Sequence, residues 1–235
     1  MKLEKVTDSG QAAPKRRYDD ACGTAHALDL IGERWALLVM RELMLGPKRF
    51  SDLRSDLQGI SANVLTQRLE GLEASGLLIR RRLPPPASTQ VYELTPWGYE
   101  AEPIVQSLGK WAARSPAHDP TLPISATSIM LSFRTMFDAG RAGDFQARVG
   151  FRLGSEHFLA TVEGGRFENG RAEFQGADVA FIGTPTGVAA FVYGKQPINV
   201  LEGGGMLRLE GDLKVAERFA TLFPLPEKVR IQFER

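Results

Sequence analysis

Apolar residues recur at helical spacing through the first hundred residues of the chain. The clearest run follows Ser61, where Leu65, Leu69 and Leu72 fall at positions i, i+4 and i+7. Ser61 stands where a helix N-cap is expected, and Gly76 stands where helices commonly end. The pattern therefore predicts an amphipathic helix between Ser61 and Gly76.

Other elements are predicted on both sides of this helix. Apolar positions at helical spacing indicate helices near residues 25–31 and 35–45 and a short helix at 50–57. Residues 77–79 and 91–94 resemble strands, and the proline-rich segment between them resembles a hairpin loop. Thr95 and Pro96 are typical of a helix start, and Ile104, Leu108 and Trp111 give the following helix an apolar stripe.

The second half of the chain instead shows strand periodicity. Phe145, Ala147, Val149, Phe151 and Leu153 alternate with polar or small residues, which predicts a half-buried strand. Further strands are expected at 157–163, 171–175, 179–182 and 207–210, with helices at 187–194 and after Asp212. This order predicts an α+β fold in which helices pack on an antiparallel sheet.

Aromatic composition divides the chain at residues 116–120, a polar segment flanked by prolines. All three Trp precede this segment, and twelve of the thirteen Phe follow it. Two cores of different composition predict two domains, one at residues 18–115 and one at 120–235. Residues 1–17 are expected to form a flexible N-terminal tail.

Charge is unevenly distributed along the chain. The whole chain has a net charge of +1, whereas residues 34–82 hold nine basic and five acidic side chains, a local charge of +4. The single cysteine, Cys22, excludes an internal disulfide and suits a reducing compartment. The sequence has no apolar stretch suited to a secretory signal or a bilayer span, so we expect a cytoplasmic protein without membrane insertion.

A short helix, a turn, a second helix and a basic hairpin form the arrangement in which one helix enters the DNA major groove. Amide and hydroxyl groups on the polar face of the second helix suit base edges, and the arginines suit phosphates. An alternative is that this polar face is only solvated. The candidate DNA-binding residues are Lys48, Arg49, Ser61, Asn63, Thr66, Gln67, Arg68, Arg80, Arg81 and Arg82.

Several motifs in this region resemble the HxlR family of winged helix-turn-helix regulators. The matching residues are Ile31-Gly32-Glu33-Arg34-Trp35, Arg49-Phe50-Ser51-Asp52-Leu53, Ile60-Ser61, Leu65-Thr66-Gln67-Arg68-Leu69 and Tyr92-Glu93-Leu94-Thr95. The resemblance implies binding of double-stranded operator DNA as a homodimer. It also implies a dimer interface formed by the helices around residues 25–31 and 98–114.

Cys22 lies where some members of this family have a cysteine, in certain cases a redox or electrophile sensor. Those members usually have proline next, whereas this chain has Gly23. The resemblance makes Cys22 a candidate redox sensor, and the alternative is an inert thiol.

The stretch from residue 124 to residue 224 resembles the sterol carrier protein type 2 family. The resemblance rests on strand order and on the Gly211-Asp212 motif within GGGMLRLEGDLKVAERFATLFP. Members of that fold enclose an apolar tunnel, which implies a lipid-like effector. The candidate ligand-binding residues are Phe133, Phe137, Phe191, Phe219 and Phe223, and the alternative is that these rings fill a solid core.

Enzymatic function is not indicated. His26, His118 and His157 are too scattered for a metal site, and no phosphate loop or nucleophile elbow is present in the sequence. We therefore predict no catalytic residues, no metal and no cofactor. The predicted function is a homodimeric transcriptional regulator controlled by an apolar small molecule. The alternative is a lipid-binding carrier whose winged helix mediates protein contacts.

Overall fold

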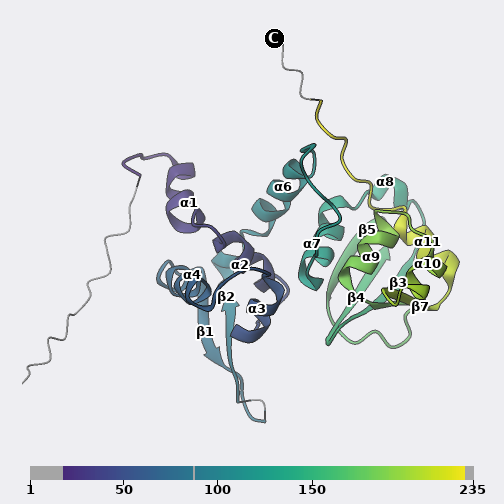
Figure 1. Cartoon of the computed structure of the whole chain (residues 1–235), viewed down its shortest axis with the longest axis horizontal. Helices are drawn as coiled ribbons and strands as arrows, with labels where there is room; N and C mark the ends of the chain where they lie inside the picture. The colour runs from purple at the N-terminus through teal and green to yellow at the C-terminus, as the bar shows by residue number, and fades with distance from the viewer. Residues whose placement is uncertain (1–17, 87, 231–235) are drawn as a thin grey trace, which may run out of the picture.

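The computed structural model describes residues 18–86 and 88–230, so the predicted tail at residues 1–17 lies outside the described residues. Its N-terminal half consists of helices and one antiparallel hairpin, in the predicted order (Figure 1). The elements are α1 (Gly23–Ile31), α2 (Ala36–Leu43), α3 (Phe50–Asp56), α4 (Ala62–Ala74), β1 (Leu78–Arg82), β2 (Gln90–Leu94), α5 (Pro96–Tyr99) and α6 (Glu102–Ala112). This is a winged helix-turn-helix.

Local capping explains where these elements begin and end. The Ser61 hydroxyl accepts a hydrogen bond from the Val64 N–H at 3.3 Å, and Thr95 caps α5 in the same way. Gly76 ends α4 with a φ of 72°, a left-handed conformation that glycine adopts without strain. Leu65, Leu69 and Leu72 are all buried, so the predicted apolar stripe faces the core.

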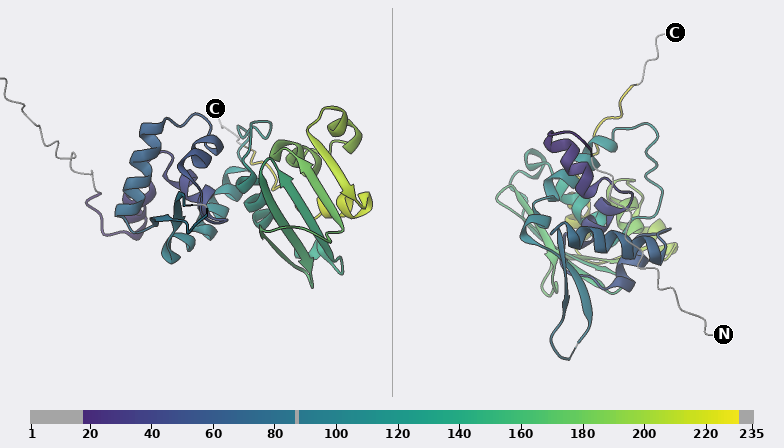
Figure 2. Two further views of the ribbon diagram at one scale, coloured as in Figure 1. Left: turned by 90° about the horizontal axis from the view of Figure 1, so that it is seen from below. Right: turned by 90° about the vertical axis from the view of Figure 1, so that its left-hand side faces the viewer.

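The C-terminal half contains one five-stranded sheet with helices. Its elements are α7 (Ala126–Met136), α8 (Ala139–Ala142), β3 (Ala147–Leu153), β4 (Glu156–Glu163), β5 (Arg166–Arg171), β6 (Val179–Gly183), α9 (Pro185–Val192), α10 (Ile198–Gly203), β7 (Leu207–Gly211) and α11 (Leu213–Ala220). The helices gather mainly on one face of the sheet (Figure 2). The whole chain is therefore α+β.

The sheet differs from prediction in two respects. Its strand order is β5-β4-β3-β6-β7, and the central β3–β6 pair is parallel, so the sheet is mixed rather than antiparallel. The prediction of a strand at residues 171–175 is wrong, because β5 occupies residues 166–171 and the following segment is a loop. That loop places Phe174 on Gly150 of β3, where an added Cβ would lie 2.4 Å from the ring. The loop carries the chain across the sheet, which is why β6 enters parallel to β3.

Helix α7, which the sequence pattern did not predict, joins the two halves. It packs against α2 and α6 on one side and against β5 on the other. Arg134 of α7 donates to both carboxylate oxygens of Glu102 in α6, at 2.7 and 2.8 Å, and to Asn169 of β5 at 2.7 Å. Buried apolar residues from both halves form one continuous cluster.

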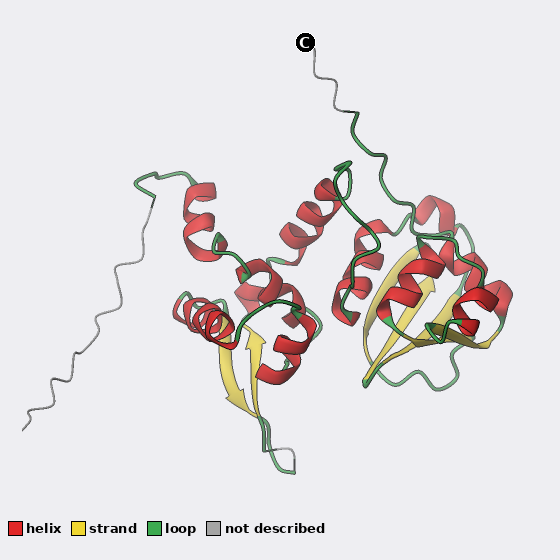
Figure 3. Cartoon of the chain, viewed as in Figure 1, coloured by secondary structure: helices red, strands yellow, loops and turns green. Residues whose placement is uncertain are grey.

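The chain returns to α6 near its C-terminal end. The Val229 N–H donates to the carbonyl of Arg114 at 2.8 Å, and the Arg114 side chain donates to the carbonyl of Glu227 at 3.3 Å. Residues 225–230 thus run back beside the end of α6 (Figures 1 and 3).

None of the described helices is long and apolar enough to cross a membrane.

Candidate nucleic-acid interface

Helix α4 presents three polar side chains away from the core. Asn63, Thr66 and Gln67 are exposed, because the buried Leu65 and Leu69 fix the rotation of the helix. Within the described part of the chain, these three side chains form no hydrogen bond. Their donors and acceptors are therefore free to meet an external partner.

The β1–β2 hairpin lies next to α4 (Figure 3). It carries three arginines with different partners. Arg80 pairs with Glu73 at 2.9 Å, and Arg81 pairs with Glu93 at 2.5 Å. Arg82 has no carboxylate partner among the described residues, and its Nε donates to the carbonyl of Ser88 at 3.0 Å. Arg82 thus keeps an uncompensated positive charge on the hairpin.

Two other predicted residues lie at helix starts. Arg49 is exposed at the start of α3, where its backbone N–H donates to Asp52, and its guanidinium has no ion-pair partner in the described residues. Ser61 is exposed, and its hydroxyl is occupied by capping α4. Arg49 therefore offers a free cation, whereas Ser61 has mainly a structural role.

Arg68 differs from its predicted role. Its guanidinium pairs with Glu33 at 3.1 Å and is only 21% exposed, so it ties α4 to the turn before α2. It does not share the exposed face of Gln67. Helical periodicity could have shown this, since Arg68 follows the buried Leu65 by three positions and precedes the buried Leu72 by four.

The structure corrects the prediction that Lys48 contacts DNA. Its side chain is 2% exposed, and its Nζ lies 3.0 Å from Glu42, 2.5 Å from Asp56 and 3.5 Å from Glu156. A phosphate cannot reach an ammonium group enclosed in this way. The sequence pattern could not indicate this cluster, because Glu156 lies more than a hundred residues from Lys48.

Glu42 is the most deeply buried member of this cluster, with no exposed surface. Burial acts to raise the pKa of the Glu42 carboxyl, but the charges of Arg41 and Lys48 and the Ser125 hydroxyl outweigh burial and lower that pKa. Burial likewise acts to lower the pKa of Lys48, and its carboxylate neighbours raise it instead. Both groups are therefore charged in the folded protein.

Asp56 is more weakly stabilised in its charged form. Burial raises the pKa of the Asp56 carboxyl more than its contact with Lys48 lowers it. Asp56 consequently protonates more readily than an ordinary aspartate.

The predicted ligand-binding phenylalanines mostly contact each other. The ring centroids of Phe133 and Phe223 lie 4.6 Å apart, those of Phe219 and Phe223 lie 4.8 Å apart, and Phe137 stacks on Phe167. Phe133 and Phe219 have no exposed surface. These rings fill the space where a tunnel was expected, so the solid-core alternative holds for Phe133, Phe137, Phe219 and Phe223.

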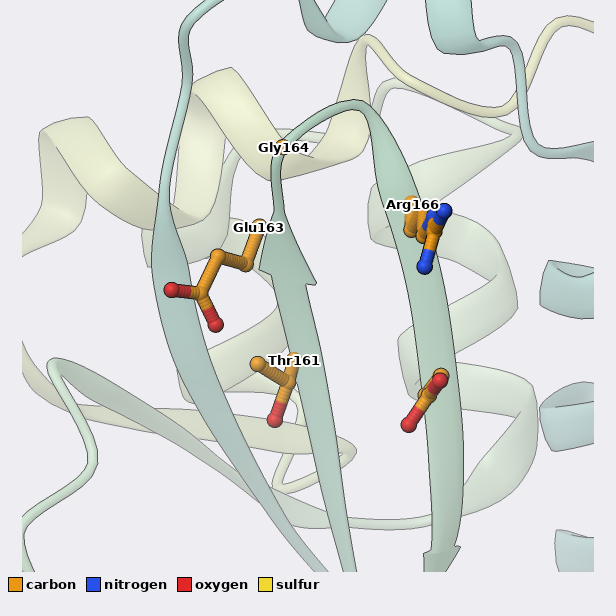
Figure 4. Close-up of a pocket in the computed structure, with 5 residues that line it drawn as sticks. Thr161, Glu163, Gly164 and Arg166 are labelled. Atoms are coloured by element: carbon orange, nitrogen blue, oxygen red, sulfur yellow. The ribbon is translucent and has the colours of Figure 1, made fainter.

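Phe191 lies in a different setting. It lines a solvent-open hollow of about 400 Å³ between α9 and α11, together with Val192, Ile198 and Ala220 and with Lys195 and Glu217. Another hollow, of about 360 Å³, lies on the outer face of the sheet at the β4–β5 turn (Figure 4). Its walls are Thr161, Glu163, Arg166 and Glu168, which are solvated strand residues.

Cys22 is exposed at the N-terminus of α1. The backbone N–H groups of Thr24 and Ala25, at the start of the helix, lower the pKa of its thiol. A larger fraction of this thiol is therefore in the reactive thiolate form than in an ordinary cysteine at the same pH. Its sensing role stays a prediction.

Comparison with known proteins relates this part of the chain to transcriptional regulators. Residues 30–119 match the HxlR-like helix-turn-helix family. The HTH-type transcriptional regulator YvaP of Bacillus subtilis is 35% identical over 86 residues, which are 37% of this chain and 80% of YvaP. The HTH-type transcriptional regulator YtfH of Escherichia coli K12 is 32% identical over 109 residues, which are 46% of this chain and 86% of YtfH.

A solved structure matches the same region. The reduced form of the transcriptional regulator YodB from B. subtilis is 32% identical, with a TM-score of 0.38, and the match covers 42% of this chain and 98% of that chain. The names of YvaP and YtfH describe them as transcriptional regulators.

The Glu42 cluster predicts a pH-dependent effect on stability. Replacing Glu42 with Gln leaves Lys48 incompletely compensated, and we expect a loss of about 3 to 5 kcal/mol in the free energy of unfolding at pH 7. A carboxyl with a lowered pKa in the folded state stabilises above its unfolded pKa, and this contribution disappears as pH falls through the folded pKa. The difference between wild type and Glu42→Gln should therefore shrink below about pH 4.

Urea denaturation of both proteins between pH 3 and pH 7 measures this difference. Glu168→Gln, which changes an exposed carboxylate on the sheet, is the matched control and should follow the wild-type curve at every pH. A gap between wild type and Glu42→Gln that stays constant over this range would contradict a paired, charged Glu42.

Proposed function

The chain belongs to the HxlR-like helix-turn-helix family of transcriptional regulators, and we propose that it binds an inverted-repeat operator as a homodimer. One observation carries the DNA-binding part of the proposal. The exposed face of α4 offers Asn63, Thr66 and Gln67 with unoccupied polar atoms, next to a hairpin with the uncompensated Arg82. DNA recognition needs this combination of groups for base edges and for phosphates.

The arginines of the hairpin differ in what they offer a phosphate. Arg80 and Arg81 must each break an ion pair with a glutamate before they can contact a phosphate. Arg49 and Arg82 have no carboxylate partner among the described residues. We therefore assign the strongest phosphate contacts to Arg49 and Arg82. Since DNA lies inside the cell, the proposal includes the cytoplasmic location expected from the sequence.

The first test separates base contacts from phosphate contacts. The probe is a DNA duplex selected from a random library by the full chain. Gln67→Ala should lower the preference for that duplex over unrelated DNA by roughly 1 to 3 kcal/mol. Arg82→Ala should weaken binding to all sequences and reduce the salt slope of log affinity by about one.

Arg152→Ala is the matched control, because Arg152 is exposed on the sheet of the C-terminal half, away from α4. This variant should bind DNA like the wild type. The proposal is wrong if the full chain binds no duplex even at low salt. The assignment of α4 is wrong if Gln67→Ala leaves the sequence preference unchanged.

The homodimer is supported by an apolar surface on α6. No residue of α6 is buried, and Ile104, Leu108 and Trp111 are exposed, Trp111 by 73%. Leu28 of α1 is also exposed, and both helices lie on the side of this half away from the hairpin tip (Figure 1). Apolar stripes of this kind are stable in water only when covered, and a second copy of α1 and α6 suits them.

If α6 forms the dimer interface, a single charged substitution in α6 should reduce the mass of the protein in solution from that of a dimer to that of a monomer. Trp111→Glu and Leu108→Glu should give monomers, because a charge would be buried in the interface, and both variants should lose most of their affinity for a two-site duplex. Sedimentation velocity over a range of protein concentrations measures the mass. Val200→Glu, at an exposed position on α10, should stay dimeric. A monomeric wild type, or a dimeric Trp111→Glu, would contradict this interface.

A sterol-carrier-like C-terminal domain at residues 120–235 is also part of the proposal. Its support is the strand order of the sheet and the Asp212 side chain, which accepts from the Lys214 N–H at the start of α11. Because the phenylalanine rings pack together, we place an apolar effector in the hollow beside Phe191. The competing carrier function has no additional support.

A fluorescent fatty acid analogue tests the effector site in the full chain. We expect saturable binding that Ala220→Trp abolishes by filling the hollow, while Val200→Trp has no effect. Regulation additionally requires that the bound analogue change DNA affinity, since only differential binding to two states shifts their populations. Absence of saturable binding would remove the effector from the proposal.

A further inference from the structure

Lys48 is joined to the hairpin through its backbone. Its N–H donates to the carbonyl of Tyr92 at 3.0 Å, and its carbonyl accepts from the Tyr92 N–H at 2.8 Å. Tyr92 lies in the middle of β2, opposite Arg80 of β1. Lys48 also precedes the first residue of α3 by two positions. A shift of the Lys48 backbone therefore acts directly on the middle of β2 and on the start of α3.

The C-terminal half holds the segment around Lys48 from three points. Glu156 of β4 lies 3.5 Å from the Lys48 Nζ. The Ser125 hydroxyl, at the cap of α7, donates to Glu42 at 2.7 Å. Arg171 of β5 pairs with Glu156, and its Nε donates to the carbonyl of Leu45 at 3.0 Å. None of these three residues belongs to the helix-turn-helix.

The charges of this cluster balance within each half, and the two sets meet at Glu156, which contacts both Lys48 and Arg171. The N-terminal half supplies Arg41 and Lys48 with Glu42 and Asp56, and the C-terminal half adds Arg171 with Glu156. Without Glu156, the side chains of Arg171 and Lys48 would place two cations close together with one carboxylate fewer. Buried charges tolerate such a loss poorly, so the segment would move toward water.

We propose that Lys48 is a positioning residue through which the C-terminal half sets the hairpin for contact with DNA. The proposal rests on the proposed DNA-binding function. Glu156 contacts the Lys48 ammonium group directly, and Ser125 and Arg171 hold the neighbouring Glu42 and Leu45. Lys48 in turn holds β2 through its backbone. The C-terminal half thereby affects a surface that it does not itself form.

A double-mutant cycle distinguishes positioning from a general loss of stability. Arg82 lies on the hairpin at the end of β1, and its contribution to binding depends on where the hairpin lies. If Glu156 positions the hairpin, the Glu156→Gln variant has already lost part of the Arg82 contact. The effects of the two substitutions are then not additive. A substitution that only lowers stability leaves the folded fraction with an unchanged Arg82 contact, and the two effects add.

The experiment uses the full chain and a duplex selected by the wild type from a random library. Affinity and its salt slope are measured for wild type, Glu156→Gln, Arg82→Ala and the double variant. We expect Glu156→Gln to reduce the salt slope, and the double variant to bind better than additivity requires by about threefold or more. Glu163→Gln, at the other end of β4, is the matched control and should leave affinity and slope unchanged.

Thermal melting of each variant shows whether it is folded at the temperature of the binding measurement. If Glu156→Gln is not, Arg171→Lys replaces it in the cycle, because this variant keeps the charge and loses the Nε donor to Leu45. Additive effects, or an unchanged salt slope in a folded variant, would overturn the positioning role while DNA binding by the wild type stands. A wild type that selects no duplex would overturn both proposals.

Discussion

A lysine and a glutamate that are almost completely removed from water determine how this chain is assembled. Moving either charge into the interior costs several kcal/mol, and this cost is offset only when each charge has close partners. Lys48 and Glu42 find those partners in α2, in α3, at the cap of α7 and in β4. Because Ser125 and Glu156 belong to the C-terminal half, the pairing of these two charges favours the observed arrangement of the two halves.

The elements of the N-terminal half could be predicted because their signals are local. Ser61, Gly76 and Thr95 act on backbone groups within a few residues, and the leucine spacing of α4 fixes which residues it exposes. The exposure of Asn63, Thr66 and Gln67 followed from the same periodicity. Family resemblance then gave the role of this surface, which the comparisons with known regulators support.

Features that depend on distant contacts could not be predicted. Lys48 lies in a basic stretch beside Arg49 and reads as a surface residue, yet its partners come from three separate elements. The parallel β3–β6 pair depends on a loop that crosses the sheet, and nothing in the sequence of either strand indicates it. A phenylalanine that lines a tunnel and one that fills a core have the same sequence pattern, and only ring-to-ring distances separate them.

The return of residues 225–230 to the end of α6 means that the C-terminal half is tethered at both of its ends to the same place. The chain enters this half after α6 and comes back to Arg114 through Val229 and Glu227. A domain joined through one chain segment can swing in any direction about that segment. A domain joined through two neighbouring segments rotates chiefly about the line that connects the two attachment points. Torque from the C-terminal half would thus pass directly into α6, the helix that carries the exposed Trp111.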